Sequence, residues 1–155
     1  MAQDSRHIIE RAALSESMPH RVRVALTILR AGTAVTLIIH GVARTALGIV
    51  DDFGGALTAW GFPVGLALAW TITVVEIAGG AAMAAGYLVR PIAAWFAFQL
   101  AMGVYLIHAR AGWFVVGAGR NGMEFSVLLI LCLGVIAMTS SDGLTLTQRR
   151  RRIQA

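Results

Sequence analysis

The chain has 155 residues, of which 57% are hydrophobic and 14% are charged, with a net charge of +5 at pH 7. Soluble domains carry about 25% charged residues, so this composition excludes an ordinary water-soluble globular protein. Together with a mean hydropathy of +0.73, it predicts an integral membrane protein.

The first segment, residues 1–22, is a polar extension without the apolar core of a signal peptide. We expect it to lie in the cytoplasm, with a short amphipathic helix around Ile8, Ile9, Ala12 and Ala13. The first apolar span then inserts as an uncleaved anchor.

Four apolar stretches follow, each close to the roughly 20 residues that a helix needs to cross a bilayer. They lie at residues 24–47, 62–87, 91–109 and 124–141. Open strands would leave backbone groups unpaired in lipid, so helices are the only structure that fits these runs. The sequence therefore predicts an all-α polytopic membrane protein, a four-transmembrane-helix bundle over residues 23–147.

The connection between the first two spans, DDFGGALTAWGFP, carries a helical pattern of its own. Phe53, Leu57 and Trp60 recur at helical spacing and form one apolar face. We expect this face to lie in the membrane interface.

Positive charge marks the topology, and every basic residue is arginine. Arginines precede the first span, follow the second at Arg90 and form a cytoplasmic tail within residues 148–155. The positive-inside rule then places both termini in the cytoplasm and the bundle in the cytoplasmic (plasma) membrane. We interpret the tail as an anchor to anionic lipid and expect no nucleic-acid partner.

Two smaller features, the GAGRNG segment and the single cysteine, do not predict a functional site. GAGRNG, residues 117–122, matches a dinucleotide-binding pattern but lies between two spans rather than in a βαβ unit. We interpret it as an external loop, with Asn121 capping the fourth helix and Glu124 in its first turn. The lone Cys132 forms no intramolecular disulfide or redox pair.

Polar residues within the spans are the candidate functional residues, because each charge costs about 2.5–3.5 kcal/mol to insert. At about 1.5 Å of rise per residue, Arg30, Glu76 and Gln99 lie about 9, 16 and 12 Å from the cytoplasmic side. They form one predicted inner layer, with Arg30–Glu76 as the preferred ion pair. Thr73, Gly79, Gly80 and Met83 share the helical face of Glu76.

A second, outer layer contains His40, Arg44, His108 and Glu124. These groups either satisfy one another structurally or form a pocket that relays protons or binds a quinone head group or a metal. Gln99 and His108 are nine residues apart, about 180° around an ideal helix, so we expect two separate layers, or one pocket and one structural pair. A haem held by His40 and His108 finds no other support in the sequence.

The order and spacing of these residues resemble the DoxX family of small four-helix membrane proteins over about residues 26–147. The resemblance includes the E-x-x-G-G motif of the second span. Its recognisable points are Arg30, His40, Gly41, Arg44, Glu76, Gly79, Gly80, Arg90, His108, Gly112, Phe114 and Glu124.

The resemblance implies a membrane subunit of an oxidoreductase complex that is linked to quinone or to thiosulfate and thiol chemistry. It implies that the chain binds either quinone or a partner that carries the cofactor, with other redox subunits as partners beside the lipid bilayer, and it leaves self-association and catalysis by the chain itself open. A non-enzymatic scaffold or assembly partner is the main alternative. A small proton-coupled transporter is a third, although no inverted repeat or discontinuous helix pair is visible.

Overall fold

The computed structural model describes residues 19–140. The proposed N-terminal helix and the basic tail lie outside the described residues. Within them the chain is helical, with long helices α2 (His20–Ala46), α4 (Gly65–Ala84), α5 (Val89–Gly103) and α7 (Glu124–Thr139). Three shorter segments complete the order: α3 (Val50–Ala59) follows α2, and a π-helical turn, η1 (Val104–His108), joins α5 to α6 (Ala109–Ala111).

Three of these helical segments are long and apolar enough to span a membrane: α2, α4 and the continuous run Val89–Ala111. The fourth, α7, is equally apolar but has 16 residues, about 24 Å of helix. The all-α membrane fold class is confirmed, with three helices of membrane-spanning length and a shorter apolar fourth. The protein is an integral membrane protein whose exposed apolar side chains face lipid.

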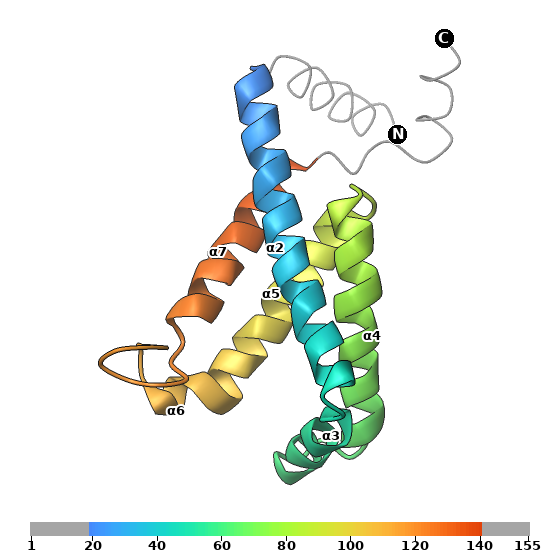
Figure 1. The fold of residues 1–155 in the computed structure, drawn as a ribbon, viewed down its shortest axis with the longest axis vertical. Coiled ribbons are helices and arrows are strands. Elements are labelled where there is room, and N and C mark those ends of the chain that lie inside the picture. Colours follow the sequence, from blue (N-terminus) through green and yellow to red (C-terminus); the bar gives the residue numbers. More distant parts are fainter. Residues whose placement is uncertain (1–18, 141–155) are drawn as a thin grey trace, which may run out of the picture.

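The helices form two arms that meet at one end (Figure 1). One arm contains α2, α3 and α4, and the other pairs α5 with α7. The arms meet at the end where α4 turns into α5, which we call the turn end. They diverge toward the end that holds α3, α6 and residues 112–123, which we call the loop end.

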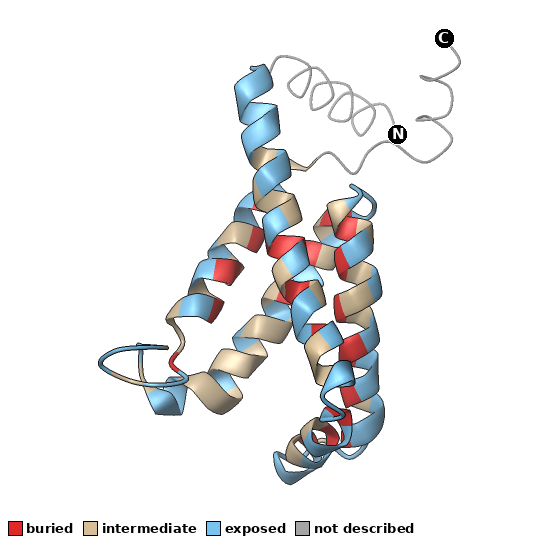
Figure 2. Cartoon of the chain, in the orientation of Figure 1, coloured by how far each residue is buried: buried red, intermediate tan, exposed pale blue. Residues whose placement is uncertain are grey.

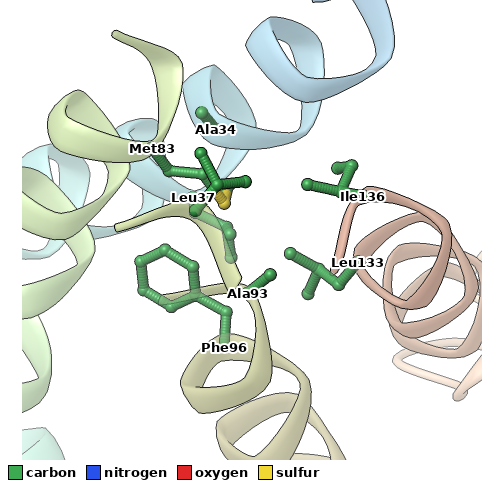
Figure 3. Close-up of a cluster of buried hydrophobic side chains, with 8 residues drawn as sticks. Ala34, Leu37, Met83, Ala93, Phe96, Leu133 and Ile136 are labelled. Carbon is green, nitrogen blue, oxygen red and sulfur yellow. The ribbon is translucent and has the colours of Figure 1, made fainter. Parts of the chain in front are cut away.

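The main core joins the two arms near the turn end. Leu37 and Met83 from the first arm pack against Phe96, Leu133 and Ile136 from the second (Figure 3). All five side chains are buried, whereas the outward surfaces of the same helices are exposed (Figure 2). Because this core closes only one half of the molecule, the other half retains space between the arms.

A second, smaller core lies at the loop end, where α3 packs against α4. Val50 and Leu57 of α3 are buried there with Ala69 and Ile72. The predicted helix in this connection is therefore present, but the expected orientation is wrong. Leu57 points into the protein because the apolar surface of α4 is available to it, and Trp60 remains 39% exposed.

Candidate functional site

A buried ion pair joins α2 to α4 within the first arm, on the side that faces the second arm. Arg44 Nη1 of α2 lies 2.8 Å from Glu76 Oε2 of α4, with side chains that are 15% and 4% exposed. The same Nη1 donates a hydrogen bond to Thr73 Oγ1 at 2.9 Å, and Thr73 in turn donates to the carbonyl of Ala69. Glu76 is thus a buried carboxylate with a fixed cationic partner.

The predicted Arg30–Glu76 pair is wrong. Close contacts at glycines show how α2 and α4 align: Gly41 packs against Glu76, whereas Arg30 packs against Gly86. Depths counted from the span ends assume that both helices begin at the same level. In the structure α2 extends beyond the end of α4 on that side (Figure 1), so Arg30 lies about ten residues, or 15 Å, from the carboxylate.

Gln99 completes the site from the second arm. Its Nε2 donates a short hydrogen bond to Glu76 Oε1, so each carboxylate oxygen has a donor. The predicted proximity of Gln99 to Glu76 is therefore found. The guanidinium of Arg44 also lies 4.6 Å from the ring centre of Phe53, a cation–π contact that brings α3 to the same point.

Three hydrogen-bonding atoms at the site, one in Gln99 and two in Arg44, have no partner in the described part of the chain. The buried Oε1 of Gln99 accepts no hydrogen bond. The hydrogen bonds of Arg44 to other side chains all leave from Nη1, so its Nε and Nη2 make none to the described residues. The site therefore presents an unused acceptor and unused donors beside a charge pair that is neutral overall.

These groups line a cavity of about 310 Å³ between the arms. Its polar lining comes from His40, Arg44, Glu76, Gln99, Ser126 and His108. The remaining wall is largely aromatic and aliphatic, with rings from Phe53, Trp60, Phe62, Trp95, Phe98 and Phe125. A small polar centre in an apolar cavity is the usual character of a site for an apolar molecule with a polar head.

The expectation that Gln99 and His108 point to opposite sides is wrong, and η1 is the reason. A π-helical turn accommodates one extra residue relative to an α-helix, which takes up about 100° of rotation. The two side chains are then separated by about 80° rather than about 180°, and both line the cavity. Glu76 and Gln99 of the predicted inner layer therefore share one site with residues of the outer layer, namely His40, Arg44 and His108.

The two histidines occupy the edge of this site. His40 lines the cavity from α2 and is exposed, one turn before Arg44. His108 Nδ1 donates to the carbonyl of Asn121 at 2.8 Å, and its Nε2 has no hydrogen-bond partner among the described residues. No group of three His, Cys, Asp or Glu side chains suitable for a metal is found in residues 19–140.

Glu124 does not belong to the cavity. Its Oε1 accepts a hydrogen bond from the Val115 amide at 2.8 Å, so it orders the loop that precedes α7. Asn121 does not cap that helix either: it adopts a left-handed conformation with φ of 59°, and Met123 precedes the first turn. The hydrogen bond from the Val115 amide therefore holds the Glu124 carboxylate against the loop and away from the cavity.

Sequence reasoning missed the roles of Thr73 and Phe53. The helical spacing places Thr73 on the face of Glu76 but does not identify it as a partner of Arg44. The same spacing assigns Phe53 to an apolar face, but it does not show that this face contacts Arg44. The three-residue spacing from Thr73 to Glu76 is the signal that, combined with the correct arginine, identifies the hydrogen-bonded cluster.

Fold and site together define a class: a polytopic helical membrane protein with a buried arginine–glutamate–glutamine cluster beside an apolar cavity. A family model described as DoxX matches residues 25–109, more than half of the chain, and the chain belongs to the DoxX family. The matched segment includes every side chain of the cluster. No curated protein and no solved structure matches the chain.

Proposed function

We propose that this protein is a membrane subunit of a quinone-linked oxidoreductase and that the cavity between its arms receives the quinone head group. Thiosulfate or thiol oxidation is the reaction class that the family resemblance favours for the assembled complex. The observation that carries the proposal is the unused hydrogen-bonding capacity of Arg44 and Gln99 within an aromatic cavity.

The chemistry of the cavity suits an uncharged ring with oxygen substituents. A carbonyl oxygen of a quinone accepts hydrogen bonds from the free N–H groups of Arg44, and a quinol hydroxyl donates to Gln99 Oε1. The arginine and glutamate charges cancel, so the site does not require a charged ligand. The aromatic rings of Trp95 and Phe98 offer stacking surfaces to a flat head group.

A bound quinone would accept two electrons and two protons, with the electrons supplied by a partner subunit. The chain itself contributes binding, orientation and proton handling. Arg44 and Gln99 hold the ring oxygens, while Glu76 keeps both of these side chains in position through its two oxygens. His108 is the group at the cavity edge whose Nε2 is available to exchange a proton with the loop end.

We infer that the turn end faces the cytoplasm. The chain enters α2 and leaves α7 at this end (Figure 1), and the positive-inside rule assigns its arginines to the cytoplasmic side of the plasma membrane. The cavity then opens in the outer half of the bilayer.

A scaffold role is the alternative, and the same cluster supports it. The hydrogen bonds of Glu76 connect α2, α4 and α5, so the cluster can specify helix packing without any ligand. The two functions differ at Gln99 Oε1, which a purely structural cluster leaves unused.

A quinone titration tests the proposal. A short-chain ubiquinone or menaquinone analogue is added to the protein in nanodiscs while tryptophan fluorescence is recorded, since Trp60 and Trp95 line the cavity. We expect saturable quenching, and Gln99→Leu should raise the Kd about tenfold because it loses one hydrogen bond of about 1–1.5 kcal/mol.

Tyr105→Phe is the matched control, because Tyr105 lies on the same helical run but is 73% exposed and outside the cavity. It should bind quinone as the wild type does. Quenching that never saturates, or equal Kd values for Gln99→Leu and wild type, would leave the scaffold as the function.

A further inference from the structure

Arg30 is a charged residue that the cavity does not use. It lies in α2 at the level of the turn between α4 and α5, with its guanidinium against Gly86. A Cβ atom placed on Gly86 would lie 3.5 Å from Nη2, 3.6 Å from Nη1 and 3.7 Å from Cζ of Arg30. These distances place the guanidinium directly against the glycine, which itself has a positive φ of 85°.

This guanidinium has no hydrogen bond or ion pair within the described part of the chain. Its Nε is buried without a partner. The carboxylates of residues 19–140 are all elsewhere: one pairs with Arg44, and the others lie at the loop end. They are Glu76, Asp51, Asp52 and Glu124.

The position of Arg30 relative to the bilayer suggests what its partner is. Helices α4 and α5 end and begin at the turn, residues 85–88, so this level marks the boundary of the apolar layer. Apolar side chains on both sides are exposed to lipid, with Ile28 at 66% and Leu88 at 68%. Phospholipid head groups lie at this depth.

We propose that Arg30 binds the phosphate of an anionic phospholipid at the turn between α4 and α5. A guanidinium presents two parallel N–H groups to phosphate oxygens, a match that the point charge of an ammonium does not reproduce. Arg90 in the first turn of α5 adds positive charge to the same end, while its Nε donates to the Ala137 carbonyl at 3.1 Å. Anionic lipid is attracted to such a site in the cytoplasmic leaflet.

Native mass spectrometry of the full chain tests this assignment. Phosphatidylglycerol is titrated into the protein in a zwitterionic detergent, with phosphatidylcholine as the uncharged comparison. We expect one tightly bound phosphatidylglycerol, with its Kd raised about tenfold in Arg30→Gln and less in Arg30→Lys. Arg110→Gln, an exposed arginine at the loop end, should bind as the wild type does.

Three outcomes would overturn the proposal. Equal phosphatidylglycerol binding by Arg30→Gln and wild type would remove Arg30 from the site. Displacement of the lipid by millimolar inorganic phosphate would identify a free anion as the ligand. A loss of thermal stability in Arg30→Lys that is the same with and without added lipid would show that the guanidinium serves a contact within the chain.

Discussion

Arg44→Met is expected to lower the free energy of unfolding by about 3–5 kcal/mol, because it leaves the buried carboxylate of Glu76 without its cation. Glu76→Met should have an effect of similar size, since it leaves the guanidinium of Arg44 uncompensated. Unfolding by sodium dodecyl sulfate in a mild detergent, followed by circular dichroism, measures both changes.

The double variant Arg44→Met, Glu76→Met separates stability from function. Removing both charges together avoids an isolated buried ion, so most of the lost stability should return. Quinone binding should not return, because the donors of Arg44 are absent. A double variant that is as unstable as either single variant would show that the pair is needed for the fold beyond its charge balance. A double variant that binds quinone as the wild type does would show that Arg44 and Glu76 do not contribute to the quinone site.

Gly41→Ala is expected to destabilise the protein by about 1–3 kcal/mol through overpacking between α2 and α4. The added Cβ would lie 2.8 Å from Ile77 Cγ1, 3.0 Å from the Thr73 carbonyl oxygen and 3.1 Å from Glu76 Cβ. Backbone atoms cannot move aside as a flexible side chain can. The helices must separate at the level of the ion pair, so the contact between Arg44 and Glu76 should weaken as well.

Gly32→Ala is the matched control in the same helix. Nothing lies within 4 Å of the Cβ it would add, so it should leave stability unchanged or raise it by up to about 1 kcal/mol. The same unfolding assay compares the two variants. Equal effects would mean that the contact at Gly41 does not limit how closely α2 and α4 approach.

The membership of this chain in the DoxX family gives the cluster wider interest, since Arg44 and Glu76 are both among the residues that carry the resemblance. The motif E-x-x-G-G combines a carboxylate with small residues one turn away. In this structure Gly80 packs against Ala34 and Ile38, and so it brings α2 close enough for Arg44 to reach Glu76. We infer that the glycines of the motif let α2 pack closely against α4, and that this packing places the Glu76 carboxylate within reach of Arg44.

The sequence by itself determined the class of the protein, the positions of its spans and the set of expensive polar residues. Apolar length and the cost of charge in lipid are local properties of a chain, so residues such as Glu76 and Gln99 can be identified without a fold. Only the tertiary structure decided which residues meet. Contacts at glycines, rather than the ends of the spans, determine how far α2 is shifted along α4. This shift makes Arg44, and not Arg30, the partner of Glu76. The π-helical turn brought His108 to the side of Gln99, since one extra residue in a helix rotates everything after it.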